Sequence, residues 1–70
     1  MISKLFGEVA QKCYEITQKG KYEVWLNSAH NKLSIVYKEG ASFNYIVALS
    51  VISEKTLKKT LEKLKGLENE

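Results

Sequence analysis

Residues 21–51, which read KYEVWLNSAHNKLSIVYKEGASFNYIVALSV, decide the fold of this chain. Within them, residues 21–27, 32–38 and 43–51 alternate along the chain and are rich in β-branched and aromatic side chains. Alternation with a period of two is typical of half-buried strands. The two short segments between them have the composition and length of hairpin turns. The stretch therefore predicts an antiparallel sheet in which consecutive strands are neighbours.

The same alternation assigns side chains to the two faces of the predicted sheet. Pairing Asn27 with Lys32 in the first hairpin places six apolar side chains on one face, namely Tyr22, Val24, Leu26, Leu33, Ile35 and Tyr37. The third strand, in the same register, is expected to add Phe43, Tyr45, Val47 and Leu49 to that face. The other face would then carry Glu23, Trp25, Asn27, Ser34, Val36, Asn44, Ile46 and Ala48.

Amphipathic segments flank the strands on both sides. Residues 3–19 carry apolar side chains three and four positions apart, which is the spacing of one helix face. Residues 53–65 show the same spacing, with Ser53 placed as an N-cap. Gly20 and Gly66 stand where each helix would end in a left-handed residue. The sequence therefore predicts a helix before the strands and another after them.

Two amphipathic helices need an apolar surface to cover, and only one face of the sheet offers it. We therefore predict one small α+β domain over residues 1–70, a two-layer sandwich in the order helix, three-stranded antiparallel meander, helix, with both helices on one sheet face. Residues 67–70 are expected to form a frayed tail. The buried core is expected to consist of Leu5, Phe6, Val9, Ile16, Val24, Leu26, Leu33, Ile35, Tyr45, Val47, Leu57, Leu61 and Leu64.

Composition limits the classes of function. The 70 residues have a formal net charge of +3, and every basic side chain except one histidine is lysine. Nucleic-acid-binding domains are often more basic and use arginine for bidentate contacts. The single cysteine, Cys13, excludes an internal disulfide and fits a reducing cytoplasm, where we expect the protein to act. No apolar run approaches the ~20 residues of a membrane-spanning helix, so no membrane partner is expected.

Residues for catalysis or metal binding are sparse. There is one histidine, His30, and no aspartate, which excludes a Ser-His-Asp triad. Cys13 and His30 fall in different predicted environments, so they do not suggest a zinc site. The glycines are isolated and form no phosphate-binding loop. We therefore expect no enzymatic activity, no cofactor and no metal.

The only tryptophan is the most informative residue for function. Alternation places Trp25 on the face that the helices leave uncovered, with Val36 and Ile46 beside it. An exposed apolar patch marks an interaction surface, and tryptophan is enriched at binding hot spots. The alternative is that Trp25 only covers the sheet beneath lysine side chains. The predicted partner-binding residues are Trp25, Val36, Ile46, Glu23 and Asn44.

Three short segments, residues 6–11, 29–32 and 53–58, resemble motifs of the double-stranded-RNA-binding domain, which has the same order of elements. In that family a glutamate of the first helix and a histidine of the first hairpin loop contact the minor groove, and lysines of the second helix contact phosphates. In this chain Glu54 stands where the family has its first phosphate-binding lysine. The alternative is a helix face that is only solvated. The resemblance implies an RNA site made of Glu8, His30, Lys32, Lys55, Lys58 and Lys59.

The chain as a whole resembles small accessory proteins of phages and mobile elements in low-GC Gram-positive bacteria, some anti-CRISPR proteins among them. Its length, its order of elements and its richness in Lys, Glu, Asn and Tyr carry that likeness. The resemblance implies a non-catalytic intracellular protein that inhibits or modulates a larger host protein or nucleoprotein by occluding its surface. Two alternatives are a double-stranded-RNA-binding domain and a structural module that forms a homodimer through the Trp25 face.

Overall fold

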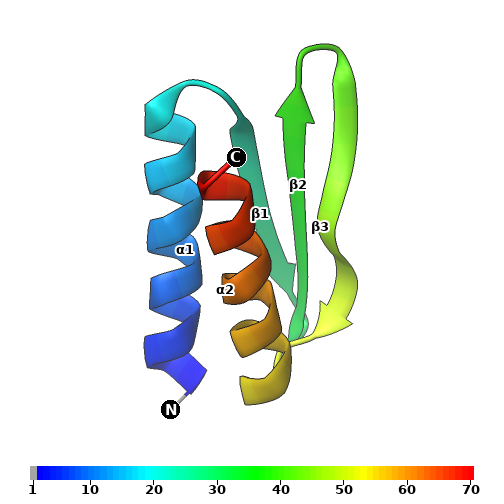
Figure 1. Cartoon of the computed structure of the whole chain (residues 1–70). Helices are drawn as coiled ribbons and strands as arrows, with labels where there is room; N and C mark the ends of the chain where they lie inside the picture. Colours follow the sequence, from blue (N-terminus) through cyan, green and yellow to red (C-terminus); the bar gives the residue numbers. More distant parts are fainter. Residues whose placement is uncertain (1) are drawn as a thin grey trace.

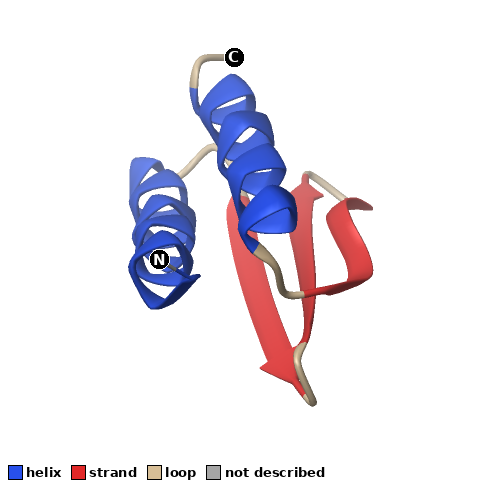
Figure 2. Ribbon diagram, turned by 90° about the horizontal axis from the view of Figure 1, so that it is seen from below, coloured by secondary structure: helices blue, strands red, loops and turns tan. Residues whose placement is uncertain are grey.

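The computed structural model, which describes residues 2–70, has two helices and three strands in the predicted order (Figure 1). Their bounds are α1 (Ile2–Lys19), β1 (Glu23–Ala29), β2 (Lys32–Glu39), β3 (Ser42–Val51) and α2 (Glu54–Glu68). The strands form one antiparallel sheet in the order β1-β2-β3. Both helices lie on the same face of this sheet (Figure 2), which confirms the predicted α+β sandwich. None of the described helices combines the length and apolarity needed to cross a bilayer.

The core lies between the helices and the covered face of the sheet. Its buried members come from both helices, from β2 and from the segment before β1: Val9, Cys13, Ile16, Tyr22, Leu33, Ile35, Leu57, Leu64 and Leu67. A second shell of partly buried side chains, Leu5, Phe6, Val24, Leu26, Tyr37, Ile46, Ile52 and Leu61, packs against them. Most of the predicted core is therefore confirmed, and the exceptions fall on β3 and at the end of α2.

The start of α2 and the end of α1 follow local sequence signals. Ser53 caps α2, because its hydroxyl accepts a hydrogen bond from the Thr56 amide at 3.2 Å. Gly20 adopts a φ of 86°, and its amide donates to the Thr17 carbonyl at 3.1 Å, as expected for a left-handed residue that ends a helix.

The first hairpin is tighter than the sequence predicts. Ala29 pairs with Lys32, so His30 and Asn31 alone form the turn, with φ values of 52° and 60°. Two consecutive residues with positive φ are the requirement of a type I′ turn, and histidine and asparagine tolerate that conformation better than most residues. Asn27 consequently lies opposite Ser34 rather than Lys32. The shift is two residues, an even number, so every side chain keeps its predicted face.

On β3 the predicted faces are wrong for several residues. Val36 pairs with Tyr45, but the preceding residue of β2, Ile35, pairs with Val47. Ile46 is therefore an extra residue, a β-bulge, and a bulge of one residue inverts the alternation on one side of it. Phe43 and Tyr45, predicted on the helix-covered face, are 64% and 67% exposed, whereas Val47 is buried as predicted.

Two residues predicted for the uncovered face are also displaced by this bulge. Ile46 packs against the core. Asn44 pairs with Tyr37, which belongs to the helix-covered face, although Asn44 itself is exposed. A second irregularity follows, because two residues of β3 lie between Val47 and Ser50, the partners of Ile35 and Leu33, whereas only one residue of β2 lies between Ile35 and Leu33. It ends at Leu49, which has a φ of 50° and is exposed rather than covered.

The predicted frayed tail is ordered. α2 continues through Gly66 to Glu68, and Leu67 is buried in the core. The Glu68 carboxylate accepts hydrogen bonds from the ammonium groups of Lys12 at 3.0 Å and Lys19 at 3.2 Å, and these two lysines hold its pKa below the usual value. The Tyr22 hydroxyl donates to the Glu70 carboxylate at 3.0 Å. The end of α2 is thus tied to α1 and to the start of the sheet.

Candidate functional site

The uncovered side of the sheet carries a cluster of exposed aromatic rings, which we call the aromatic face and define as Trp25, Val36, Phe43 and Tyr45. Trp25, Val36 and Tyr45 form one row across the three strands, because Val36 pairs with both of the others. The side chain of Trp25 is 42% exposed. The rings of Trp25 and Phe43 lie with centroids 5.9 Å apart and planes inclined by 35°. The structure thus places Trp25 and Val36 together and adds Phe43 and Tyr45, two aromatic residues that the sequence predicted on the helix-covered face.

Charged residues stand at one end of the aromatic face. Lys38 pairs with Phe43, and its ammonium nitrogen lies 5.9 Å from the centre of the Phe43 ring. Glu23 pairs with Lys38 from the other side. An apolar aromatic centre bordered by charges of both signs is the composition of protein–protein interfaces, in which charged residues are depleted at the centre.

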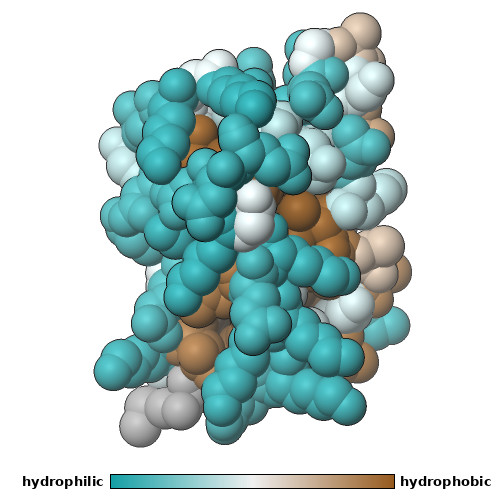
Figure 3. All heavy atoms as spheres, in the orientation of Figure 1, coloured by the Kyte–Doolittle hydropathy of each residue, from teal (hydrophilic) through white to brown (hydrophobic). Residues whose placement is uncertain are grey.

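The helix-covered side is different in character. Figure 3, drawn in the orientation of Figure 1, shows mainly hydrophilic atoms over α1 and α2, with hydrophobic atoms visible between α2 and β3. The exposed lysines of α2 contribute to this hydrophilic surface.

The only cysteine, Cys13, is 5% exposed, and burial raises the pKa of its thiol to about 11. A thiol with that pKa is protonated at neutral pH and therefore a poor nucleophile.

The residues implied by the RNA resemblance are only partly brought together. The Asn31 carbonyl accepts a hydrogen bond from the Ile52 amide at 2.9 Å, so the turn that contains His30 lies beside the start of α2. Lys58, one of the implied phosphate contacts, is paired with Glu54 at 3.0 Å, and this pairing holds the pKa of Glu54 below its usual value. One end of the molecule therefore carries His30, Lys32 and Lys55. Glu8 is exposed on a different element, α1.

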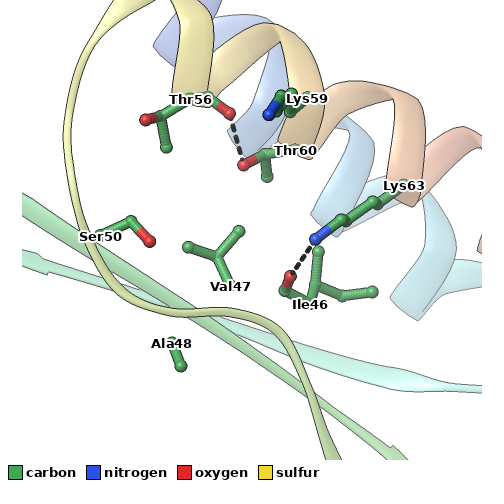
Figure 4. Close-up of a pocket in the computed structure, with 8 residues that line it drawn as sticks. All are labelled: Ile46, Val47, Ala48, Ser50, Thr56, Lys59, Thr60 and Lys63. Atoms are coloured by element: carbon green, nitrogen blue, oxygen red, sulfur yellow. Dashed lines mark hydrogen bonds between the residues drawn. The ribbon is translucent and has the colours of Figure 1, made fainter.

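Lys59 lines a hollow that the sequence did not reveal. We call it the basic hollow (Figure 4); it has a volume of about 440 Å³ and lies between β3 and α2. It is lined by Ile46, Val47, Ala48, Ser50, Thr56, Lys59, Thr60 and Lys63. The Lys63 ammonium group reaches across it to the Ile46 carbonyl at 3.4 Å. Because the hollow depends on the path of the bulged strand, no sequence motif marks it.

Among residues 2–70, no three side chains of the metal-ligating types gather into one cluster. Comparison of the chain with known protein families, with curated proteins and with solved structures finds no match. The two features that remain as candidate sites are the aromatic face and the basic hollow.

Proposed function

We propose that this is a non-catalytic binding protein, encoded by a phage or mobile element, that uses its aromatic face to occlude a surface of a larger protein or nucleoprotein inside the host cell. The observation that carries the proposal is the exposure of Trp25, Phe43 and Tyr45 on the one sheet face that neither helix covers. A domain with so small a core would gain stability by burying these rings. Their position outside is explained by a partner that covers them.

The size of the aromatic face favours a larger partner over a second copy. The whole uncovered face of the sheet, with three strands ~4.8 Å apart and about seven residues long, covers roughly 300 Å² in projection, and the aromatic face is only part of it. Each side of a stable complex contributes ~800 Å² of accessible surface. Two flat copies stacked on each other would bury little more than this face. A partner with a concave surface can also reach the sheet edges, including Leu49 and Val51, which are exposed beyond the aromatic face.

The proposal is tested by photo-crosslinking in host cells, followed by affinity measurement with the partner that is recovered. A benzophenone amino acid at position 45 should cross-link to one partner, and the same group at position 65 on α2 should not. With that partner purified, Trp25→Ala and Tyr45→Ala should each weaken binding by about 2 kcal/mol, as central aromatic anchors do, while Lys65→Ala leaves it unchanged.

Two results would contradict the proposal. Cross-links that arise only from position 65 would place the interface on the helices. A wild-type protein that sediments as a dimer, and that Trp25→Ala converts to a folded monomer, would assign the aromatic face to self-association.

Duplex RNA binding is a second candidate, favoured by the hydrogen bond that holds the His30 turn against the start of α2. If this end of the molecule binds RNA, the variant Lys55→Ala, Lys58→Ala should weaken duplex binding and flatten its salt dependence, because phosphate contacts are lost. We expect only weak binding in the wild type, since Glu54 already pairs with Lys58. Electrophoretic mobility shifts at several salt concentrations measure both quantities, and an unchanged salt slope in the variant removes this candidate.

A further inference from the structure

We propose that the basic hollow between β3 and α2 binds the phosphate group of a small phosphate ester. The hollow lies on the helix-covered side of the sheet, opposite the aromatic face, so this site is separate from the proposed partner surface. Its volume of about 440 Å³ falls within the range of small-molecule sites.

The backbone of β3 is shaped around the hollow. Between Val47 and Ser50 the strand takes one residue more than β2 opposite it, and Leu49 adopts a φ of 50°. A leucine in the left-handed region is unusual, and such residues cluster at functional sites. β-bulges occur next to functional sites, where they redirect a side chain. Here the detour leaves Ser50 half-buried, with its hydroxyl directed into the hollow (Figure 4).

The charges around the hollow are all positive. Lys59 and Lys63 are four residues apart on α2 and so extend from the same helix face, whereas none of the eight lining residues is acidic. Like charges in this spacing slightly destabilise a helix, and an anion bound between them would relieve the repulsion. Among residues 2–70, the ion pairs involve only Lys12, Lys19 and Lys58, so no carboxylate neutralises Lys59 or Lys63, as is true of most lysines of the chain. The Lys63 ammonium group donates to one carbonyl and has two further N–H groups to offer.

The polar groups suit a phosphate better than a single carboxylate. Two ammonium groups and a hydroxyl can each meet one oxygen of a tetrahedral dianion, and charge-assisted hydrogen bonds of this kind are the strong ones. The Thr60 hydroxyl already donates to the Thr56 carbonyl at 2.7 Å, and the Thr56 hydroxyl accepts a hydrogen bond from the Ser53 hydroxyl at 3.1 Å. The side of the hollow formed by β3 presents the apolar side chain of Val47 toward α2 (Figure 4), which suits the organic part of an ester.

Titration followed by amide chemical shifts in NMR spectra tests the site directly. Inorganic phosphate and uridine 5′-monophosphate, added at constant ionic strength, should shift the amides of Ser50, Lys59 and Lys63 saturably, with the nucleotide binding more tightly. Sodium chloride added in place of phosphate should cause no saturable shift of these amides. The variant Lys59→Gln, Lys63→Gln should bind at least tenfold more weakly. The matched control Lys4→Gln, Lys65→Gln, which removes the same charge outside the hollow, should stay within twofold of the wild type.

A second variant tests the site without changing its charge, and the same spectra show whether each variant is folded. Ser50→Ala should weaken phosphate binding severalfold. The proposal would be overturned if both lysine double variants lost phosphate affinity equally, or if the amide shifts spread over all lysines of α2. Either result would mean that phosphate is attracted non-specifically by positive charge. A different result would be a single-stranded oligonucleotide that shifts the amides of the hollow at a lower concentration than the mononucleotide does. That result would assign the hollow to a nucleic-acid backbone and would also overturn the proposal.

Discussion

Ile35→Ala should lower the free energy of unfolding by about 2–5 kcal/mol, the usual range for truncating a buried isoleucine to alanine. Ile35 is 0% exposed and lies at the middle of the central strand, between Leu26 on β1 and Val47 on β3. Strands on both sides and helices above restrict any collapse of the cavity. A domain of this size has a small free energy of unfolding, so we expect a large fraction of the variant to be unfolded at 37 °C.

The neighbouring residue provides the matched control. Val36 follows Ile35 in β2 but projects from the other face, between Trp25 and Tyr45. Val36→Ala should cost under about 1 kcal/mol, because it leaves no enclosed cavity. Urea unfolding followed by circular dichroism measures both variants. Equal costs would contradict the assignment of the two faces.

The order of elements was predictable because each carries its own local signal. Apolar spacing marks both helices, Ser53 and Gly20 mark two of their ends, and alternation marks the strands. The first hairpin was predicted two residues too loose, yet its faces were right. An error of an even number of residues leaves the alternation intact.

The faces of β3 were not predictable from alternation. Residues 45–49 are five consecutive apolar or aromatic residues, YIVAL, so a pattern with a period of two fits either parity. The structure resolves this ambiguity with a bulge at Ile46, which buries Val47 and leaves Tyr45 outside.

The residues of the candidate sites were predictable only where the strands keep their regular alternation. Trp25 and Val36 lie on strands whose faces were read correctly, and their place on the aromatic face was foreseen. Phe43 and Tyr45 were missed because they precede the bulge. Lys59 was assigned either to the RNA site that the resemblance implies or to a solvated helix face, and only the path of β3 beside it creates a hollow. Backbone irregularities of this kind arise from packing and leave no spacing signal in one sequence.

The end of α2 shows how burial overrides a local stop signal. Glycine within a helix costs about 1 kcal/mol relative to alanine, whereas burying a leucine side chain contributes roughly 1.5–3 kcal/mol. Continuing the helix through Gly66 places Leu67 in the core and Glu68 between Lys12 and Lys19. The gain exceeds the cost, so the helix does not end at the glycine.

Leu67→Ala should therefore destabilise the protein by about 2–4 kcal/mol, much more than expected for a residue in a frayed tail. Leu67 is 5% exposed and borders the same small hollow as Ile16 and Tyr22. Its loss should also release the last turn of α2, and hydrogen exchange at the Glu68 amide should accelerate. Leu67→Met preserves most of the volume and should cost less than about 1.5 kcal/mol.

Gly66→Ala distinguishes a continuous helix from one that ends at the glycine. Gly66 lies inside α2, and a Cβ added there would meet no atom within 4 Å. Alanine should therefore stabilise the protein by up to about 1 kcal/mol, because it favours the helix and restricts the unfolded chain. At a left-handed terminating residue the same change would destabilise it, since alanine is strained at positive φ. A fall in the urea midpoint of Gly66→Ala would show that the helix stops there and that Leu67 and Glu68 do not anchor it to α1.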